Sequence, residues 1–547
     1  MNFSSTLASG VRLTRIFGQF NRVSFRRQAK SVYPLRLVRA ITNRCCGLVV
    51  RRILGDDGRQ WMQGPEVDRM QAWVPRGKVC EMDRRGGTTI ALALLICASC
   101  SESEPEKASL VGSNVVVVVV DALRADRLGT YGYERDTSPI LDEFAEQGAV
   151  FDSVTSPASQ TVPSMISLWS GVYPHHHGNQ YFPKTNSIGV ERKGARPALP
   201  DSSSLLAESF LEAGYQTVAV VTNPWLQAEY GFGRGFESYV LLDPANSAYP
   251  YARGDEVSFA AEMAIAHAAS NPDQPLFLYL HFMDVHAPYW PSPDEQALLA
   301  PGVTDRSFYA NGRLRGVDES KMRDASRLYD AEVRTFDGFL GGLLESIEAM
   351  GGNRETLVVL TADHGDEFFE HGGMGHGFSL YEEVVHVPLV FVHPRIPSRR
   401  IKGPVSLVDF APTLLALLGL EAGSDMDGIS LAQSVRGQAQ HGLDGHRWVL
   451  SELGDLKLVR SGDRKLILAR ELEGPGRVER FDLARDPYEQ SRLSDAETRE
   501  WPKEISDRAE ALLNASRQEV SRERGSKRFD PIPDAVQERL KALGYSD

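Results

Sequence analysis

Short apolar runs that alternate with amphipathic segments dominate the hydrophobic pattern of the chain. The apolar runs lie at 115–120, 217–222, 276–282, 356–362 and 387–392. The first is six consecutive valines, and β-branched runs without polar alternation are typical of strands buried on both faces of a parallel sheet. Segments 255–270 and 327–350 have the periodicity of helices. The alternation predicts an α/β fold with a doubly wound, mostly parallel sheet sandwiched by helices.

Charge and cysteine are distributed unevenly along the 547 residues. Residues 1–100 hold 17 basic and 6 acidic side chains, whereas the remaining residues hold 43 basic and 67 acidic ones. Because duplex binding depends on neutralising phosphates with Lys and Arg, this acidic body argues against nucleic acid as a partner. All five cysteines also lie within residues 1–100. The acidic body therefore has neither a disulfide nor a thiol nucleophile.

Segment 82–100 has the composition of an export signal. Two arginines precede an apolar run at 88–97, and small residues precede Cys100. The run is too short to span about 30 Å of hydrocarbon, so it predicts a signal peptide rather than a membrane helix. The end of the segment resembles a bacterial lipobox, with Cys97 where leucine is usual, and Cys100 is then the lipidated residue. Cleavage by an ordinary signal peptidase is an alternative.

The neighbouring regions are interpreted from this signal. Residues 1–81 are either a mis-assigned gene start or a basic arm, because a signal peptide works only at an N-terminus. Residues 101–113 have the polar composition of a tether. We therefore expect an exported protein of a bacterium, periplasmic or attached to the outer membrane, whose only membrane contact is an N-terminal lipid anchor.

Polar residues directly follow three of the predicted strands. Asp121 follows the first, Asp284 and His286 follow the third, and Asp363 with His364 follow the fourth. In doubly wound sheets, ligands bind outside the carboxyl ends of the strands, so these side chains are candidates for one site. A single Asp at a strand end is ordinary, whereas three such ends in one chain favour a site. If the third strand continues, His286 faces the same way as Asp284.

A hydroxyl stands near the start of a predicted helix in the segment SQTVPSMISLWSGVYPHHHG, which begins at Ser159. Pro163 suits the first helical position, which puts Thr161 at or just before the N-cap. The Thr161 hydroxyl is then close to the partially positive end of the helix, where anions bind. A hydroxyl at an N-cap is also the ordinary way to cap a helix, so its position alone leaves both interpretations open.

Four ordered motifs carry a family resemblance. They are DALRADRLGTYGY from Asp121, TVPSMISLWSGVYPHHHG from Thr161, HFMDVHAPY from His281 and TADHGDEFFEHGGMGHG from Thr361. In this order they resemble the sulfatase family of the alkaline phosphatase superfamily. The resemblance implies an alkaline phosphatase-like catalytic domain over residues 114–437. It also implies a smaller α+β subdomain over residues 438–547.

The resemblance implies one divalent cation, held by Asp121, Thr161, Asp363 and His364. Thr161 matches the position of the family's nucleophile, and the cation would lower the pKa of its hydroxyl. Carboxylates and an imidazole gathered at strand ends would repel or lose solvation without an ion among them. His364 stands where calcium sulfatases have asparagine, which favours Mn²⁺, Zn²⁺ or Mg²⁺, whereas family analogy favours Ca²⁺.

The resemblance also implies contacts with the substrate. His376 matches a family histidine near the leaving oxygen, where it can act as proton donor. The expected substrate-binding residues are Asp284, His286 and Arg124. Two alternatives stay open: Asp284, His286 and His376 could hold a second metal, and Arg124 is as suited to pairing with Asp126 as to touching substrate.

Three departures from the family pattern bear on the reaction. Thr161 replaces the cysteine that sulfatases oxidise to formylglycine, and no cysteine follows Cys100, so formylglycine chemistry is excluded. Met165 replaces an arginine, and Ala122 replaces the second Asp of the usual pair. A threonyl phosphate can be hydrolysed by in-line attack at phosphorus, which favours phosphate or phosphonate esters over sulfate esters.

The sequence therefore predicts a metal-dependent hydrolase of phosphate, phosphonate or sulfate esters. Its expected partner is a small anionic ester, on a glycan or a lipid head group. The alternatives are a transferase that passes the phospho group to a lipid or sugar, and a non-catalytic lipoprotein that binds anions.

Several conspicuous residues are more simply structural. The histidines at 175–177 are expected to close a turn, and Asp409 is expected to start a helix. Asp330, Glu332 and Asp337 are expected on the solvated face of the helix at 327–350.

Overall fold

The computed structural model describes residues 110–179, 199, 204–245, 249–304, 319–350, 354–439, 443, 447–469 and 477–523. The predicted basic arm at 1–81, the signal at 82–100 and most of the tether at 101–113 lie outside these residues. Within the described part of the chain, no helix is both long enough and apolar enough to cross a membrane.

The main sheet has eight strands in the order β12-β2-β11-β7-β1-β6-β4-β5. They are β1 (Asn114–Val120), β2 (Ala149–Phe151), β4 (Gln216–Val221), β5 (Ser238–Leu241), β6 (Leu276–Phe282), β7 (Thr356–Ala362), β11 (Leu389–Val392) and β12 (Arg399–Ile401). Strands β7, β1, β6, β4 and β5 are all parallel, whereas β11 runs antiparallel to β7 and β2. The predicted mostly parallel sheet is confirmed.

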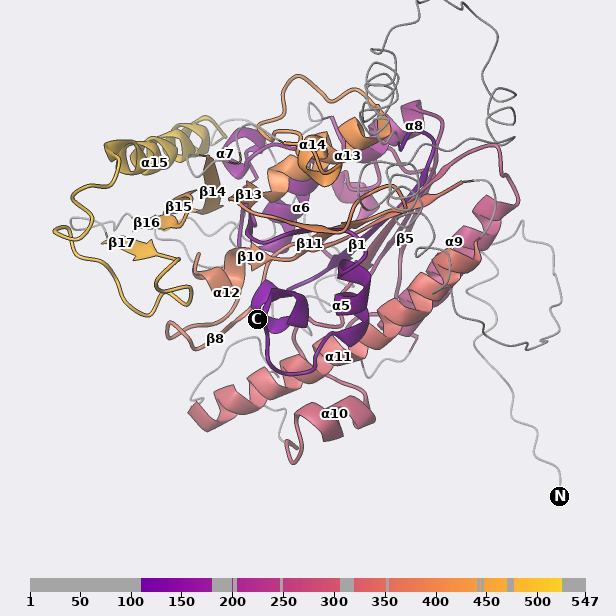
Figure 1. Cartoon of the computed structure of the whole chain (residues 1–547), viewed down its shortest axis with the longest axis horizontal. Helices are drawn as coiled ribbons and strands as arrows, with labels where there is room; N and C mark the ends of the chain where they lie inside the picture. The colour runs from indigo at the N-terminus through magenta and orange to yellow at the C-terminus, as the bar shows by residue number, and fades with distance from the viewer. Residues whose placement is uncertain are drawn as a thin grey trace, which may run out of the picture. The chain divides into compact units, whose positions relative to one another are not determined.

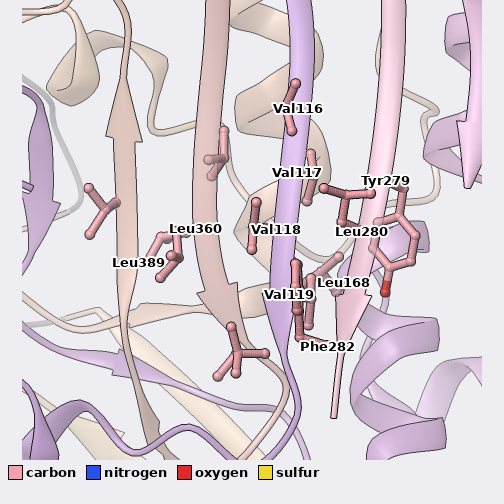
Figure 2. Packing of buried hydrophobic residues seen from close by; sticks show 14 of the residues in the cluster. Val116, Val117, Val118, Val119, Leu168, Tyr279, Leu280, Phe282, Leu360 and Leu389 are labelled. Carbon is pink, nitrogen blue, oxygen red and sulfur yellow. The ribbon is translucent and has the colours of Figure 1, made fainter. Parts of the chain in front are cut away.

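Strand β1 lies at the centre of the core, and all seven of its residues are buried. Val118 pairs with Leu280 of β6 on one side and with Leu360 of β7 on the other. Figure 2 shows these aliphatic side chains packed between neighbouring strands. Burial on both faces explains why β1 has no polar alternation.

Helices cover both faces of the sheet (Figure 1). One layer contains α5 (Pro139–Ala145), α9 (Gly254–Ala269), α10 (Pro293–Leu299) and α11 (Glu319–Ala349). The opposite layer contains α6 (Thr161–Ser170), α8 (Leu206–Glu212), α13 (Phe410–Leu418) and α14 (Ala432–Val435). The sheet is therefore sandwiched by helices, as the alternating pattern predicts.

Several short strands, helices and turns complete the fold of the larger domain. A three-stranded sheet has the order β10-β3-β13, formed by β3 (Val154–Thr155), β10 (His386–Val387) and β13 (Val405–Ser406). A hairpin pairs β8 (Glu367–Phe368) with β9 (Met374–Gly375). The short helices are α7 (Pro174–His177), α12 (Glu382–Val385) and the 3₁₀ turns at Ala125–Arg127, Gly129–Tyr131, Ala228–Tyr230 and Leu407–Asp409.

The C-terminal region forms a separate antiparallel sheet with one long helix. Its strands, in spatial order, are β14 (Trp448–Leu453), β15 (Leu456–Ser461), β16 (Arg464–Ala469) and β17 (Arg477–Asp482). Helix α15 (Lys503–Glu523) packs on β15 and β16, and Ile505 of the helix lies in one buried cluster with Val459 and Leu466 of these strands. The predicted smaller α+β subdomain is confirmed.

The prediction that three carboxylates of α11 lie on a solvated face is wrong. Asp330, Glu332 and Asp337 are all buried. Glu332 pairs with Arg253, and Asp337 accepts hydrogen bonds from the first turn of α5 at 2.8 and 3.0 Å. Periodicity identifies the apolar stripe of a helix, but α5, α9 and α10 also pack on α11 and cover its polar side.

Two smaller predictions also need correction. The run at 387–392 is not one strand, because Pro388 has no N–H for a ladder and the chain divides there into β10 and β11. Helix α6 begins at Thr161 after the N-cap Gln160, so Pro163 is its third residue rather than its first. The N–H groups of the first turn have no helical partner, and a proline is tolerated there.

Candidate active site

The ends of three parallel strands meet at one edge of the sheet. Val120, the last residue of β1, pairs with Phe282 of β6 and with Ala362 of β7. The polar residues that come next in the chain are therefore neighbours, and Asp121 and Asp363 both lie there, fully buried. The carboxyl end of the sheet is thus the candidate site, as the strand ends predict.

The two carboxylates are each held by one oxygen. Asp121 Oδ2 accepts a hydrogen bond from Asn223 Nδ2 at 2.7 Å and lies 3.2 Å from His281 Nε2. Asp363 Oδ1 accepts hydrogen bonds from two backbone N–H groups. These are the N–H of Ala122, at 3.1 Å, and the N–H of His364, at 2.9 Å. Asp121 Oδ1 and Asp363 Oδ2 are buried and have no hydrogen-bond partner among the described residues.

The backbone at Ala122 is in the left-handed region, with φ of 62°. A side chain at positive φ is strained, and such strain of about 1–3 kcal/mol is retained mainly at functional sites. Here the unusual conformation turns the Ala122 N–H toward Asp363. The residue that replaces the family's second aspartate thus contributes a backbone donor to the same cluster.

Thr161 and His364 complete this cluster. Thr161 Oγ1 lies 3.3 Å from His364 Nε2 and 3.5 Å from Asp121 Oδ2. His364 Nε2 is also 3.4 Å from Asp363 Oδ2 and 3.7 Å from Asp121 Oδ1. His364 Nδ1 is 3.0 Å from the Gly365 carbonyl, to which it can only donate, so Nε2 carries the lone pair.

This donor set suits a divalent cation. Asp121, Asp363 and His364 each offer a ligand atom within 4.8 Å of the others. Burial and the Asp121 charge raise the pKa of Asp363 to about 8, while burial lowers the pKa of His364 to about 4 and keeps its imidazole neutral. Buried carboxylate oxygens without a partner usually face a bound metal. A histidine that ligates a metal usually donates its other N–H to a carbonyl or carboxylate, as His364 does.

His376 lies beside this cluster, in the turn that follows β9. Its ring centroid is 4.2 Å from that of His364, and its Nδ1 is 2.7 Å from Asp366 Oδ1. Gly377 has φ of 76°, and a Cβ there would lie 2.8 Å from the side chain of Gln160, so the turn packs against the residue that precedes Thr161. Burial lowers the pKa of His376, but the Asp366 carboxylate outweighs this and raises it above the usual value.

Of the predicted substrate-binding residues Asp284 and His286, only His286 borders the cluster. The ring centroid of His286 is 5.1 Å from that of His376, so His286 borders the cluster. Strand β6 ends at Phe282, and the turn that follows points Asp284 the other way, where its Oδ1 accepts from the backbone N–H of Gly254 at 3.0 Å. The expectation that Asp284 and His286 face the same side is therefore wrong, because the strand does not continue.

Arg124 is fully engaged by protein groups. Its guanidinium binds both oxygens of Asp126, at 2.8 and 2.7 Å, and also Glu370 Oε1 and the Asp366 carbonyl, each at 2.8 Å. The residue is 2% exposed. Of the two roles open to Arg124, these contacts favour holding the loops that carry Asp126 and Asp366.

Sequence reasoning missed four residues of this site: Asn223, His281, Tyr289 and Asp366. Asn223 stands just past β4 at the same edge of the sheet, a signal identical to the one that identified Asp121. His281 is a single polar residue in the buried strand β6. Asp366 lies in the quoted DHGD motif, but its contacts to His376 and to the Tyr289 hydroxyl, at 2.7 and 3.0 Å, depend on folding.

The residues expected to be structural have protein partners. His175 Nδ1 is 2.5 Å from Glu452 Oε1, His176 pairs with Asp427, and His177 Nε2 is 3.1 Å from the Ser167 hydroxyl. The acidic and histidine cluster of Glu367, His371 and Glu383 is also satisfied internally, since His371 Nδ1 lies 2.6 Å from Glu383 Oε1. Asp409 is the N-cap of α13, as predicted.

Comparison with known proteins gives a consistent result. Residues 113–420 match the family model described as Sulfatase. The Delta 4,5-hexuronate-2-O-sulfatase of Bacteroides thetaiotaomicron is 24% identical over 449 residues, covering 74% of this chain and 88% of that protein.

Solved structures agree at the level of the fold. The phosphonate monoester hydrolase of Agrobacterium radiobacter has a TM-score of 0.57 and 19% identity, over 74% of this chain and 96% of that chain. A protein in complex with its substrate D-glucosamine-2-N,6-O-disulfate has a TM-score of 0.59 and 17% identity, over 74% and 98% of the two chains. The sheet and its helices thus have the fold of these two solved structures.

Proposed function

Because the chain belongs to the sulfatase family and is an ester hydrolase, we propose that it cleaves phosphate, phosphonate or sulfate esters through Thr161 and one divalent cation. The observation that carries the proposal is the convergence of Thr161 Oγ1 and His364 Nε2 with orphaned oxygens of Asp121 and Asp363. The Thr161 hydroxyl is 3.3 Å from His364 Nε2, which itself lies 3.4 and 3.7 Å from the two unpaired carboxylate oxygens, and this arrangement suits a shared cation better than a helix cap.

Asp121, Asp363, His364 and Thr161 would hold the cation. When bound, it would lower the pKa of the Thr161 hydroxyl and withdraw charge from the ester oxygen. Thr161 stands at the first residue of α6, so its Oγ1 lies at the positive end of a helix that is buried along its length. That position favours both the threonine alkoxide and an anionic ester placed against it.

Thr161 gives its hydroxyl proton to solvent, its Oγ1 forms the new bond to phosphorus, and the bond from phosphorus to the ester oxygen breaks. His376 is placed to give the departing oxygen its proton from Nε2, because Asp366 holds the Nδ1–H. A water then attacks phosphorus in line with the threonine oxygen, which leaves and regains its proton. The same first step on a sulfate ester leaves a threonine sulfate that water must attack at sulfur.

Two observations bear on the choice among esters and acceptors. The relatives include both sulfatases and phosphonate monoester hydrolases, and the glycan sulfatases among them favour an ester carried on a sugar. The relatives reported above are hydrolases, which favours water over a lipid or sugar as acceptor. The intact nucleophile geometry at Thr161 argues against a module that only binds anions.

A substrate and metal panel tests the proposal. The metal-free protein would be assayed with 4-nitrophenyl phosphate, 4-nitrophenyl phenylphosphonate, bis(4-nitrophenyl) phosphate and 4-nitrophenyl sulfate, each with Mn²⁺, Zn²⁺, Mg²⁺ or Ca²⁺. We expect turnover that requires a cation and favours the phosphorus esters. Turnover of the sulfate alone would overturn the phosphorus preference, and no turnover of any ester would favour the binding alternative.

Export and lipid attachment at Cys100 are proposed from the sequence of segment 82–100. The two arginines, the apolar run and the small residues before Cys100 support it. Labelled palmitate incorporated in a bacterial host, and lost in a Cys100→Ser variant, is the expected result. Unlabelled protein of the size produced by ordinary cleavage would favour the alternative processing.

A further inference from the structure

The carboxylate of Asp121 is divided between two environments. Its Oδ2 faces the donors Asn223 Nδ2, at 2.7 Å, and His281 Nε2, at 3.2 Å, and is also 3.5 Å from Thr161 Oγ1. Its Oδ1 has no hydrogen-bond partner among the described residues and lies 3.7 Å from His364 Nε2. One oxygen is thus held by the protein, while the other points into the cluster that suits a cation.

The orientation of Asn223 is fixed by its own backbone surroundings. Its Oδ1 accepts the backbone N–H of Trp225 at 2.9 Å, so the amide must present Nδ2 to Asp121. The residue before it, Thr222, donates its hydroxyl to the His281 carbonyl at 3.0 Å, which ties the end of β4 to β6. Asn223 is fully buried, and reversing its amide would place an oxygen against the Asp121 carboxylate.

The tautomer of His281 follows from its two neighbours. An ionised Asp121 can only accept, so the proton of His281 is on Nε2. Nδ1 then has the lone pair and accepts from the Tyr279 hydroxyl, which lies 2.8 Å away. The ring of Tyr279 in turn packs against the indole of Trp169.

These contacts join two elements of the site. Trp169 is on α6, the helix that begins at Thr161, and its ring packs edge-on against Tyr279 with centroids 4.8 Å apart. His281 and Tyr279 point to the same face of β6, two residues apart, so one strand carries the donor and the group that orients it. The same network therefore supports the helix of the nucleophile and the first carboxylate.

We propose that Asn223 and His281, with Tyr279 behind His281, are positioning residues that hold Asp121 by Oδ2 and so direct its Oδ1 at the cation. The inference rests on the proposed cation site. Neither residue needs to touch cation or substrate: they fix the rotation of the carboxylate. Groups that orient a metal ligand in this way change metal affinity by about 10–100-fold when they are removed.

The test measures cation binding rather than catalysis. Metal-free full-length protein would be titrated with Mn²⁺ alone, with free Mn²⁺ followed by electron paramagnetic resonance and the titration repeated with Zn²⁺ by calorimetry. His281→Phe keeps the ring volume but removes the donor, and Asn223→Leu keeps the shape but removes the amide. We expect each to weaken the dissociation constant by about 10–100-fold.

Two further variants separate positioning from a merely structural role. His281→Gln can place an amide N–H near the position of Nε2, and we expect it to restore affinity to within about threefold of the parent. His393→Phe is the matched control, because His393 is also buried and one of its ring nitrogens also faces a hydroxyl, that of Ser113 at 3.2 Å, but it stands after β11 outside the site. It should bind Mn²⁺ as the parent does.

The outcomes are distinguishable. A parent protein that binds neither cation overturns the proposed site and this inference with it. A parent that binds while His281→Phe and Asn223→Leu bind equally well overturns the inference alone, as would equal losses in His281→Phe and His393→Phe. If His281→Phe does not fold, as judged by its thermal melt, Tyr279→Phe replaces it; a dissociation constant within twofold of the parent would then overturn the role of the network.

Discussion

Two regions of the molecule bury carboxylates but balance their charge differently. One contains Asp121 and Asp363 at the end of the main sheet, and the other contains Glu452 in the C-terminal sheet. Glu452 Oε2 is 2.7 Å from the buried Lys457 ammonium, and its Oε1 faces His175. Lys457 and His175 outweigh burial and lower the pKa of Glu452 to about 2. At the main sheet no lysine or arginine contacts the pair within the described part of the chain, and the pKa of Asp363 is raised to about 8.

The difference lies in whether the protein itself supplies the positive charge that each carboxylate faces. In the C-terminal sheet the Lys457 ammonium is the cation, so both oxygens of Glu452 have partners within the protein. These contacts hold β14 and β15 together and against α7, which contains His175. At the main sheet two carboxylate oxygens are left over, and an external cation would complete them. Burial alone, which is the same in both places, does not separate the two.

The largest effect is expected from Thr161→Ala, which leaves both carboxylates of the cluster in place and removes the oxygen that we propose as the nucleophile. We expect kcat/KM to fall by at least about 10³-fold, as when a nucleophile is lost elsewhere. The metal-dependent rise in melting temperature should persist, since Asp121, Asp363 and His364 remain. Steady-state kinetics with the preferred ester, and a thermal melt with and without Mn²⁺, measure the two.

Ser170→Ala is the control for this variant. Ser170 lies on the same helix, and its hydroxyl donates to the Ile166 carbonyl at 2.7 Å, away from the cluster. Its activity should stay within about twofold of the parent. If Thr161→Ala kept more than about a tenth of the parent activity, another group would have to be the nucleophile.

Lys457→Met tests the C-terminal cluster by removing the ammonium that pairs with Glu452. It leaves Glu452 as a buried charge without its main partner, and we expect the free energy of unfolding to fall by about 3–5 kcal/mol. Urea denaturation measures this loss, and Mn²⁺ should not restore it. The double variant Glu452→Gln/Lys457→Met should recover most of the stability; equal losses in the single and double variants would show that the ion pair is not the cause.

Asp363→Asn removes a negative charge, rather than a positive one, from the cluster at the end of the main sheet. The amide keeps an oxygen for the two backbone N–H groups and relieves the repulsion with Asp121, so the metal-free variant should be at least as stable as the parent. Cation at about 100 times its dissociation constant should stabilise the parent by about 2.7 kcal/mol and the variant by almost nothing. Urea denaturation with and without Mn²⁺ checks both, and an equal gain in the two proteins contradicts the ligand assignment.

Asp366→Asn alters a buried carboxylate whose partners are the His376 imidazole and the Tyr289 hydroxyl. It should weaken the hold on His376 Nδ1 and its ability to donate a proton. We expect kcat/KM to fall about tenfold for an alkyl ester, which needs the proton, and less than about threefold for a 4-nitrophenyl ester, which does not. Equal losses on both esters would place Asp366 in binding or folding rather than in leaving-group protonation.

Local pattern predicted the strands and most of the candidate site. Six valines followed by Asp121, and TLVVLTA followed by Asp363 and His364, identify buried parallel strands and their polar ends without any long-range information. The family motifs then associated Thr161 with the same edge. The structure brings these four side chains together because β1 and β7 pair in register and α6 begins beside them.

The rest depends on contacts between distant segments. Whether Asp284 faces His286 or Gly254 is decided by where β6 stops, and whether Glu332 meets water or Arg253 is decided by the helices packed on α11. Asn223 and His281 became part of the site only when β6 paired with β1 and β4 paired with β6.

The sequence by itself determined which residues form strands and which chemical groups stand at their ends, because both depend on near neighbours along the chain. The tertiary structure alone decided which buried carboxylate finds a partner within the protein. Hydrogen bonds and ion pairs act over a few ångströms between groups that can be more than a hundred residues apart, as the 102 positions between Asp121 and Asn223 illustrate. The unpartnered oxygens of Asp121 and Asp363 could be recognised only from that arrangement.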